Sequence, residues 1–416
     1  MNKVLVIGGG GREHAIVHAL SLSSQVDKIY AAPGNAGIAH MAQCVHLKDT
    51  QVDELLEFAK KEEITLTVVG PEASLALGIV DKFTAAGLTI FGPTQAATRI
   101  ESSKEFAKEL MKKYNVPTAD YQVFDDFESA NQYIHNHTLP IVLKYDGLAA
   151  GKGVVVAETM EQAELALEDM LLDKKFGKGR VVIEEFLTGP EFSFMCFVSD
   201  ENVYPMVVAQ DHKRAYDGDC GPNTGGMGAY SPLPFISQND IDWSLENIMK
   251  PMAKALVAEG TPFRGVLYGG LMKTNNGIKV IEFNARFGDP ETEVVLPRLK
   301  SEIFPIFMNI AKGIPCDEIV WDKRAAIGIV LASKGYPGSY EKGFPISGIG
   351  AVNGQVFHMG TAVKDGKIIT NGGRVLFVTI MGDDLAEAKQ KADAEVAKIK
   401  CDNLFHRTDI GWQAIK

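Results

Sequence analysis

The residues best suited to chemistry lie between positions 282 and 293, directly after an apolar run that ends at Ile281. This run predicts a buried strand. Glu282 and Asn284 are two residues apart, so both side chains would leave the same face of that strand. A carboxylate and an amide supply hard oxygen ligands, which suit Mg²⁺ held beside phosphates. The pair therefore predicts a metal site.

More charged residues follow this pair. Arg286 keeps the two-residue spacing and offers a planar fork for a carboxylate or a phosphate. Asp289, Glu291 and Glu293 then add acid to the same segment. A solvated strand end with a polar turn would explain such a motif standing alone. The presence of further polar segments elsewhere in the chain favours a functional site.

A glycine cluster at residues 8–11 follows the strand expected over residues 4–7 and precedes a helix expected over residues 12–20. Glycines let the backbone approach a ligand closely, and a helix N-terminus favours an anion. A dinucleotide site is disfavoured because Glu13 replaces the third glycine of that fingerprint and no acid ends the second strand. A phosphate-binding turn is favoured, with a turn that binds nothing as the alternative.

A second glycine-rich loop, over residues 146–153, follows an apolar strand that ends in Lys144. Its spacing is not that of a Walker A loop, because Gly147 and Gly151 enclose three residues and Gly153 replaces the Ser or Thr. A strand-loop-strand of this kind suits a flap over a triphosphate, with Lys144 as a fixed charge beneath it. A plain hairpin is the alternative, although Lys144 after three apolar residues needs a partner.

Two further segments are rich in polar residues. The apolar strand at 181–183 runs into Glu184 and Glu185, whose side chains would point to opposite faces, so that only one can face a given pocket. Backbone groups beyond this strand could read an adenine edge, and Glu191 could accept ribose hydroxyls. Residues 210–228 contain candidates for binding a small zwitterionic or phosphorylated substrate, namely Asp211, Lys213 and Arg214. An exposed strand end and an ordinary surface loop are the respective alternatives.

Three predicted units carry these segments. Residues 1–102 alternate strand and helix, which predicts a parallel sheet with helices on both faces. Residues 103–318 read as mixed α+β, and include an Asn-Asn-Gly hairpin turn at 275–277. Residues 319–416 combine antiparallel strands with an amphipathic helix over 384–400.

The composition of the chain argues against some classes of function. The chain has 416 residues, with 42 Lys and Arg against 53 Asp and Glu, so its net charge of -11 argues against general binding to nucleic acid or anionic membranes. The five cysteines are scattered without a C-x-x-C, and the nine histidines show no metal-ligand spacing. Together with the lack of a recognisable signal peptide or membrane span, the cysteines predict a cytoplasmic protein with reduced thiols.

The polar segments, taken together and in this order, resemble the ATP-grasp superfamily and, within it, the phosphoribosylamine–glycine ligase family. The resemblance spans essentially the whole chain and rests on Gly-Gly-Gly-Gly-Arg-Glu-His-Ala at 8–15, Asp-Gly-Leu-Ala-Ala-Gly-Lys-Gly-Val at 146–154, Gly-Pro-Asn-Thr-Gly-Gly-Met-Gly at 221–228 and Arg-Phe-Gly-Asp-Pro-Glu at 286–291. The last two segments are specific to this family. Phe287 departs from it, since Leu or Met would be expected there.

The resemblance implies a multidomain α/β and α+β fold. It has an N-terminal parallel α/β (pre-ATP-grasp) domain, an ATP-grasp domain with a mobile flap subdomain at about 117–190, and a small C-terminal mixed β/α domain. It also implies ATP with Mg²⁺ or Mn²⁺ as cofactors, and glycine and 5-phosphoribosylamine as substrates, in purine biosynthesis. The oligomeric state is left open, with a monomer as one alternative.

Roles for individual residues also follow from the resemblance. Lys144 and Arg286 would be catalytic, and Glu282 and Asn284 would hold the metal. The nucleotide would contact Lys104, Lys144, Gly151, Lys152, Gly153, Glu184, Glu185, Leu187 and Glu191. The other substrates would contact Gly9, Gly10, Gly11, Asp211, Lys213, Arg286, Asp289 and Glu291.

The implied reaction begins when the glycine carboxylate attacks the γ-phosphate of ATP to form glycyl phosphate. The amine of phosphoribosylamine then displaces phosphate, and a closed flap keeps water away from the acyl phosphate. The nearest alternative is another ATP-grasp carboxylate–amine ligase or a carboxylase. A nucleotide-binding oxidoreductase and a non-enzymatic nucleotide sensor are alternatives from other classes.

Overall fold

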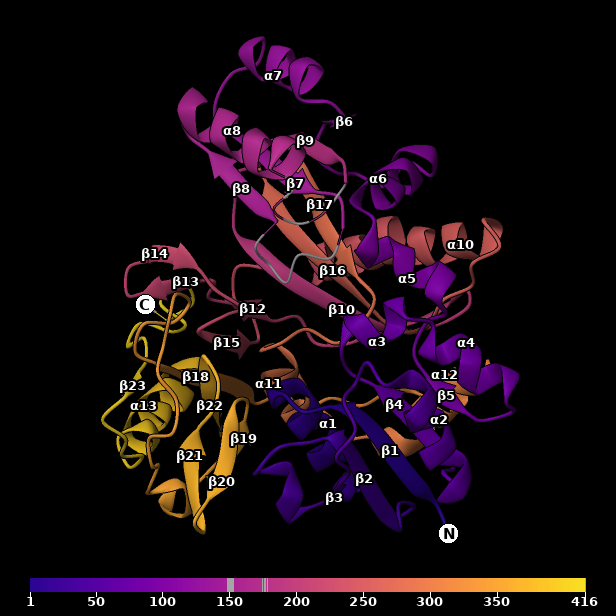
Figure 1. The fold of residues 1–416 in the computed structure, drawn as a ribbon, viewed down its shortest axis with the longest axis vertical. Helices are drawn as coiled ribbons and strands as arrows, with labels where there is room; N and C mark the ends of the chain where they lie inside the picture. The colour runs from indigo at the N-terminus through magenta and orange to yellow at the C-terminus, as the bar shows by residue number, and fades with distance from the viewer. Residues whose placement is uncertain (148–152, 174, 176, 178, 416) are drawn as a thin grey trace.

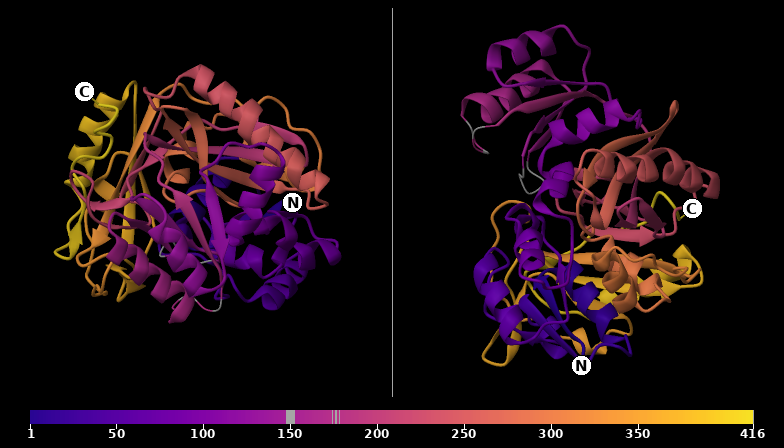
Figure 2. Two further views of the ribbon diagram at one scale, coloured as in Figure 1. Left: turned by 90° about the horizontal axis from the view of Figure 1, so that it is seen from above. Right: turned by 90° about the vertical axis from the view of Figure 1, so that its right-hand side faces the viewer.

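The computed structural model describes residues 1–147, 153–173, 175, 177 and 179–415. Figure 1 shows a small lobe at the top of the view and, below it, a larger body in which the N-terminal unit (indigo) and the C-terminal unit (yellow) lie side by side. The right-hand view of Figure 2 shows this lobe projecting from the body. None of the helices in the described ranges is long and apolar enough to cross a membrane.

The N-terminal unit is built on a parallel sheet with the strand order β3-β2-β1-β4-β5. Val4 and Val6 of β1 pack into one core and Leu5 and Ile7 into another, so both faces of the sheet are covered, as the sequence predicts. The strands are β1 (Lys3–Gly8), β2 (Lys28–Pro33), β3 (Gln43–Cys44), β4 (Leu66–Val69) and β5 (Ile90–Phe91). The helices are α1 (Gly11–Ser21), α2 (Val52–Lys61), α3 (Glu72–Ala76), α4 (Ile79–Ala85) and α5 (Gln95–Ser102), with a short 3-10 turn η1 (Ile38–His40).

The small lobe is an antiparallel sheet with the order β6-β9-β7-β8, packed against two helices. Its buried residues form a separate hydrophobic core, which includes Leu143, Ile183 and Leu167. Its elements are β6 (Tyr121–Phe124), α7 (Phe127–His135), β7 (Ile141–Tyr145), β8 (Val154–Ala157), α8 (Met160–Leu167), η2 (Glu168–Leu172) and β9 (Val181–Glu185). Lys144 pairs with Val154, so β7 and β8 form the strand pair expected on either side of the glycine-rich loop.

The body contains a second antiparallel sheet, ordered β11-β10-β16-β17. The hairpin of β16 and β17 turns at Asn275–Gly277, as the Asn-Asn-Gly signal predicts. The strands are β10 (Glu191–Ser199), β11 (Asn202–Pro205), β16 (Arg264–Thr274) and β17 (Gly277–Asn284). The helices are α6 (Lys104–Lys113), α9 (Gln238–Ser244), η3 (Leu245–Met249), α10 (Lys250–Ala258), α11 (Thr292–Val295), η4 (Leu296–Arg298) and α12 (Ile303–Lys312).

The third sheet joins the C-terminal unit to the middle of the chain. Its order is β12-β15-β18-β22-β19, with β23 also paired to β18. Strands β12 (Gln210–Asp211) and β15 (Gly228–Ser231) bound the long polar loop, which also contains β13 (Arg214–Tyr216) and β14 (Cys220–Asn223). The C-terminal elements are β18 (Ala325–Ser333), η5 (Ile349–Ala351), β19 (Gln355–His358), β20 (Thr361–Lys364), β21 (Lys367–Thr370), β22 (Arg374–Gly382), α13 (Leu385–Val396) and β23 (Leu404–Phe405). Because β15 pairs with β18, the polar loop is fixed between the body and the C-terminal unit.

Candidate active site

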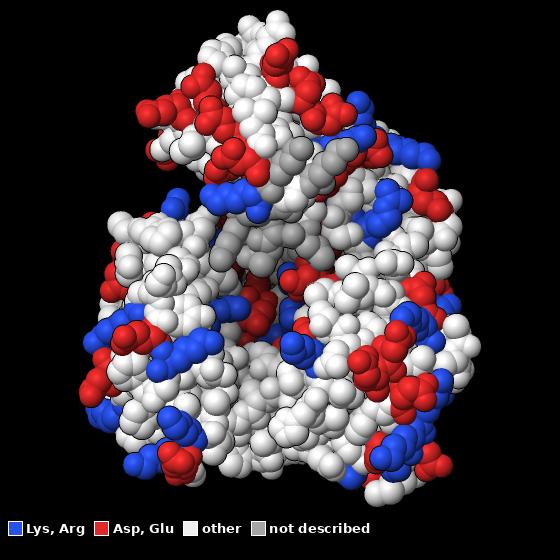
Figure 3. Space-filling view, viewed as in Figure 1, with Lys and Arg blue, Asp and Glu red and all other residues white. Residues whose placement is uncertain are grey.

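A cavity of about 380 Å³ lies where the N-terminal unit, the small lobe and the body meet. Figure 3 shows the hollow beneath the small lobe, with acidic and basic side chains gathered inside it. The charged residues that line this cavity are Arg12, Glu72, Glu101, Lys104, Lys108, Lys144, Glu184, Glu282, Arg286, Asp289 and Arg374. They come from segments far apart in the sequence, and their mixed charge suits a polyanion together with a cation.

Glu282 and Asn284 lie on one side of β17, and both line the cavity, while Phe283 between them is buried. Neither polar side chain has a hydrogen bond or an ion pair with any described residue. Burial alone would raise the pKa of Glu282, but Lys144, together with other nearby cations, outweighs burial and lowers the pKa below its ordinary value. An ionised carboxylate and an amide oxygen, both unpartnered, fit a hard divalent cation.

The described residues contain no cluster of three or more His, Cys, Asp or Glu that could hold a metal by itself. A cation at Glu282 and Asn284 would therefore take most of its ligands from phosphate oxygens or water. Mg²⁺ binds in this way beside nucleotides, through one or two protein groups and the substrate phosphates.

Lys144 is held rigidly at the base of the cavity. Its side chain is buried and donates to the carbonyl of Ile281 at 2.9 Å, and its Nζ lies 3.0 Å from Oε1 of Glu184. The other oxygen of Glu184 lies 3.0 Å from Nζ of Lys108, which also donates to Thr118. Burial lowers the pKa of Lys108 to about 8 although Glu184 acts against the shift. The partner that the sequence requires for Lys144 is thus Glu184, shared with a second lysine.

Lys104 lies at the start of α6, beside the glycine-rich loop. Its backbone N–H donates to Oδ1 of Asp146 at 2.5 Å, and its ammonium donates to the carbonyl of Gly147 at 3.3 Å. Asp146 therefore caps the helix and draws the loop toward it. Gly153 lines the cavity, whereas Gly151 and Lys152 lie outside the described residues.

The residues expected at the nucleotide base are arranged around the end of β9. Glu184 faces the cavity, while Glu185 is exposed and pairs with Lys279 at 2.6 Å, so the two acids point to opposite faces as alternation predicts. Leu187 and Glu191 do not line the cavity. Glu191 instead forms an ion pair of 2.5 Å with Lys213, which brings two of the expected ligand-binding residues together.

Arg286 is fixed by two acids of the N-terminal unit. Its Nη2 lies 2.9 Å from Oε1 of Glu101 and its Nε lies 3.2 Å from Oε2 of Glu72. Burial alone would lower the pKa of Arg286, but these two carboxylates raise it above its ordinary value. The guanidinium is thus permanently charged and oriented, with N–H groups to spare for an incoming anion.

Gly10 and Glu13 explain how the first glycine loop departs from the dinucleotide fingerprint. The carboxylate of Glu13 accepts the Gly10 N–H at 2.7 Å and lies 2.6 Å from Arg12, so it caps α1 from inside the turn. A Cβ at Gly9 would lie 2.4 Å from the carbonyl oxygen of Gly34, so only glycine fits that position. The acid that replaces the third glycine is therefore part of the turn itself.

Gly9, Gly10 and Gly11 line a second cavity of about 370 Å³ between the N-terminal and C-terminal units. Asp289 and Arg374 line both cavities and form an ion pair of 2.9 Å. Arg374 also donates to the carbonyl of Gly225 at 2.7 Å. The two cavities therefore share one charged wall, and a ligand in the second could reach the first.

Asp211 and Glu291 are tied into a polar cluster behind that wall. Burial raises the pKa of Asp211 to about 7, even though the charge of Lys213 opposes the shift. Glu291 is buried and accepts hydrogen bonds from Ser193 at 2.8 Å and Tyr268 at 2.9 Å. Neither Asp211 nor Glu291 lines either cavity.

Family models for all three parts of the phosphoribosylglycinamide synthetase match this chain. The N domain covers residues 2–101, the ATP-grasp (A) domain residues 102–292 and the C domain residues 326–413. The phosphoribosylamine–glycine ligase of Halalkalibacterium halodurans is 53% identical, over 99% of this chain and 97% of its own length.

The chain belongs to the phosphoribosylglycinamide synthetase family.

Solved structures agree with this membership. The phosphoribosylamine–glycine ligase of Thermotoga maritima superposes with a TM-score of 0.87 at 33% identity, over 98% of this chain and 100% of that one. The biotin carboxylase domain of the Hydrogenobacter thermophilus 2-oxoglutarate carboxylase, solved with MgADP and bicarbonate, gives a TM-score of 0.75 at 16% identity. That alignment covers 97% of this chain and 91% of the other, and it supports the ATP-grasp fold alone.

The sequence reasoning missed several residues that line the first cavity of this protein. Lys108 had a usable signal, because it lies four residues after Lys104 and so on the same face of α6. Glu72, three residues after β4, and Glu101, three residues before Lys104, had weaker signals, whereas Arg374 had none. Only the packing of the separate units brings them to Arg286 and Asp289.

Proposed function

We propose that this protein is an ATP-dependent ligase that joins glycine to 5-phosphoribosylamine, giving glycinamide ribonucleotide, ADP and phosphate in de novo purine biosynthesis. The observation that carries the proposal is the convergence of Lys144, Glu282, Asn284 and Arg286 on one cavity in a chain of this family. The five cysteines are free, which fits a cytoplasmic enzyme with small-molecule partners.

ATP would place its triphosphate in the first cavity. Lys144 suits this role because Glu184 and the carbonyl of Ile281 hold its ammonium in place before any ligand arrives. The backbone beyond Glu184 would read the adenine and Glu191 the ribose. The full set proposed for the nucleotide is Lys104, Lys144, Gly151, Lys152, Gly153, Glu184, Glu185, Leu187 and Glu191.

Glu282 and Asn284 would hold Mg²⁺ or Mn²⁺. Their oxygens are unpartnered among the described residues and line one side of the cavity, so the donor set fits such an ion. When bound, the cation supplies neutralisation of charge on the phosphate chain. The lysine at 144 would add to this neutralisation from the floor of the cavity.

Arg286 would hold the glycine carboxylate in line with the γ-phosphate. One carboxylate oxygen bonds to the γ-phosphorus as the bond to the bridging oxygen of ADP breaks, which leaves glycyl phosphate. The amine nitrogen of phosphoribosylamine then attacks the acyl carbon, phosphate departs with the electron pair of the C–O bond, and the nitrogen loses a proton. The loop over residues 146–153 would exclude water from the acyl phosphate.

Phosphoribosylamine would lie in the second cavity, with its amine toward the first. Gly9, Gly10 and Gly11 offer backbone approach to a phosphate, and Arg374 adds a partly buried guanidinium at the shared wall. The residues proposed for contact with the two substrates are Gly9, Gly10, Gly11, Asp211, Lys213, Arg286, Asp289 and Glu291. Glu291 accepts hydrogen bonds from Ser193 and Tyr268 and would therefore help to fix the shape of the site.

The decisive experiment measures ADP formation by the purified protein with ATP and Mg²⁺. ADP should form at an enzymatic rate only when glycine and freshly generated phosphoribosylamine are both present, and mass spectrometry should detect glycinamide ribonucleotide. ADP formation that depends on bicarbonate instead would favour a carboxylase. ATP turnover that ignores glycine would refute the proposed substrate.

A further inference from the structure

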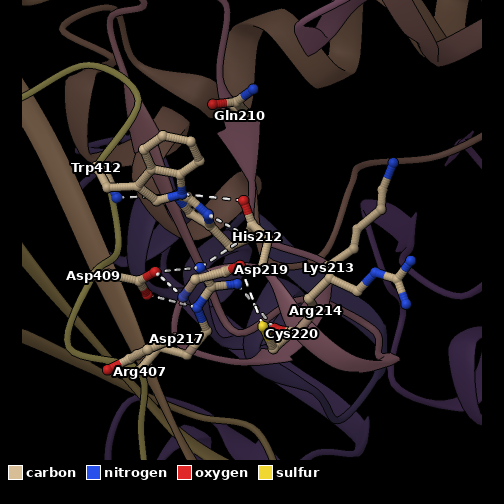
Figure 4. Close-up of polar contacts among 12 residues, drawn as sticks. Gln210, His212, Lys213, Arg214, Asp217, Asp219, Cys220, Arg407, Asp409 and Trp412 are labelled. Carbon is tan, nitrogen blue, oxygen red and sulfur yellow. Dashed lines mark hydrogen bonds and ion pairs between the residues drawn. The ribbon is translucent and has the colours of Figure 1, made fainter. Parts of the chain in front are cut away.

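The C-terminal segment, residues 406–412, closes over the polar loop of the middle of the chain, residues 212–224 (Figure 4). Thr408 donates its backbone N–H and its hydroxyl to the carboxylate of Asp217, at 2.8 Å and 2.5 Å. The Gly218 N–H donates to Asp409 at 2.8 Å, and the indole of Trp412 donates to Asp219 at 3.1 Å. Two segments almost 200 residues apart are thus joined by hydrogen bonds, and each segment supplies donors to the other.

Arg407 is the centre of this contact. Its side chain is buried, and its guanidinium pairs with both oxygens of Asp409 at 2.7 Å and 2.8 Å and with Asp219 at 2.8 Å. Bidentate pairing of this kind fixes orientation as well as charge. The ring of His212, whose Nδ1 lies 3.7 Å from Asp219, together with Arg407 holds the pKa of Asp219 below its ordinary value. Both acids therefore stay ionised around the buried cation.

The same segment holds both neighbours of Lys213. The Gly411 N–H donates to Nε2 of His212 at 2.9 Å, and Arg407 donates to the carbonyl of Arg214 at 3.0 Å. The Lys213 carbonyl accepts from the backbone and the hydroxyl of Thr224, at 2.7 Å and 2.8 Å. The backbone on either side of Lys213 is thus anchored to the far end of the chain.

The side chain of Lys213 leaves this anchored backbone in the other direction, as Figure 4 shows. Its ammonium pairs with Glu191, the acid proposed for the ribose, while Lys213 itself lines neither cavity. By contrast, Arg214 turns back to the carbonyl of Gly221 in its own hairpin. Lys213 is therefore the side chain through which a displacement of residues 212–214 would reach Glu191 and the proposed nucleotide site.

We propose that Arg407 is a positioning residue for the ligation and acts through Lys213. The inference rests on the proposed function, because it assigns to the C-terminal segment the placement of a substrate-binding lysine. Arg407 lines neither cavity, so it would not touch a substrate itself. It couples the C-terminal segment to Lys213, so that the loop presents this lysine only when the segment is docked.

The test is a double-mutant cycle in the full-length protein with Arg407→Lys and Lys213→Ala. Lysine keeps the charge but cannot make the bidentate fork. Arg407→Lys should lower kcat/KM for glycine about tenfold to a hundredfold, as expected for a misplaced group. In the Lys213→Ala background, Arg407→Lys should lower kcat/KM for glycine less than about twofold, because the link from Arg407 through Lys213 to Glu191 is already removed.

The matched control is Arg324→Lys, which alters an exposed arginine paired with Asp322 and should leave kcat/KM unchanged. Thermal melting tests whether each variant is folded, and Asp409→Asn replaces Arg407→Lys if the latter does not fold. Full additivity of either variant with Lys213→Ala, or parental activity of the folded variant, would overturn the proposal. A parent protein without glycine-dependent ADP formation would instead defeat the proposed function.

Discussion

At the scale of single residues, the site is defined by which charges are paired and which are not. Lys144, Lys108 and Arg286 each have a buried acid beside them, so they are fixed before any ligand binds. Glu282 and Asn284 have no partner among the described residues. A preorganised site for a cation and a polyanion requires both kinds of group. The paired groups hold their position, and the unpaired oxygens are free to bind the ligand.

Replacing Glu282 and Asn284 together by Ala should therefore separate activity from stability. Glycine-dependent ADP formation should fall by at least about a hundredfold, because charge on the transferring phosphoryl group loses its cation. The melting temperature should hardly change, since neither side chain contributes a bond to the fold.

ADP release and thermal melting measure the two effects of this double change. Glu201→Ala, at an exposed position with no ion pair to any other described residue, is the control. An active double variant would remove the metal assignment from these residues.

At the scale of elements, strand alternation and one turn decide the shape of the cavities. The strand pair of β7 and β8 places Lys144 among the residues that line the first cavity, and alternation along β9 and β17 selects which acids face inward. The turn between β1 and α1 is tight, because the carboxylate of Glu13 fills its inner side and the chain passes close to Gly34. Alternation and turn glycines are local features, so the sequence could predict them.

Gly9→Ala should disturb the second cavity alone. The added Cβ would lie 2.4 Å from the carbonyl oxygen of Gly34, so the turn must shift. The KM for phosphoribosylamine should rise about tenfold, while the affinity for ATP stays within about twofold. Initial rates and nucleotide titration give the two values.

Gly350→Ala serves as the control for Gly9→Ala, because a Cβ there meets open space. A variant at Gly9 that loses ATP affinity and spares phosphoribosylamine would contradict the assignment of the second cavity.

At the scale of the whole molecule, the N-terminal and C-terminal units are locked together by a histidine contact. The backbone N–H of His358 donates to Nδ1 of His14 at 2.8 Å, and His358 also shares a hydrogen bond with Thr361. Burial lowers the pKa of His14 to about 3 and that of His358 to about 4. Both rings are therefore neutral in the folded protein near pH 7.

Acid should weaken the fold through these two rings. The unfolded chain binds their protons near pH 6.5, while the folded protein does not, so stability falls as the pH drops from about 6.5 toward 4. Each ring contributes a slope of about 1.4 kcal/mol per pH unit within this window. His358→Phe removes one of the two rings, so the free energy of unfolding should fall less steeply with pH, by the slope of one ring.

Urea unfolding at several pH values between 7 and 4.5 measures these slopes. His46→Phe, at an exposed position of the N-terminal unit, is the matched control and should leave the slope unchanged. Equal slopes in the parent and in the His358 variant would contradict the prediction.

The sequence by itself determined the local chemistry and the fold class: a parallel N-terminal sheet, an acid and an amide on one strand face, a lysine in the strand pair that flanks a glycine-rich loop, and a family resemblance along the whole chain. The first three follow from periodicity and spacing, which act over a few residues, and the resemblance rests on the motifs at 8–15, 146–154, 221–228 and 286–291. Tertiary structure decided the long-range partners. Glu101 meets Arg286, Arg374 meets Asp289 and Arg407 anchors the loop of Lys213, because residues far apart in sequence are brought together only when sheets and units pack. No local pattern encodes such contacts, since the free energy that selects them comes from burial of the whole assembly.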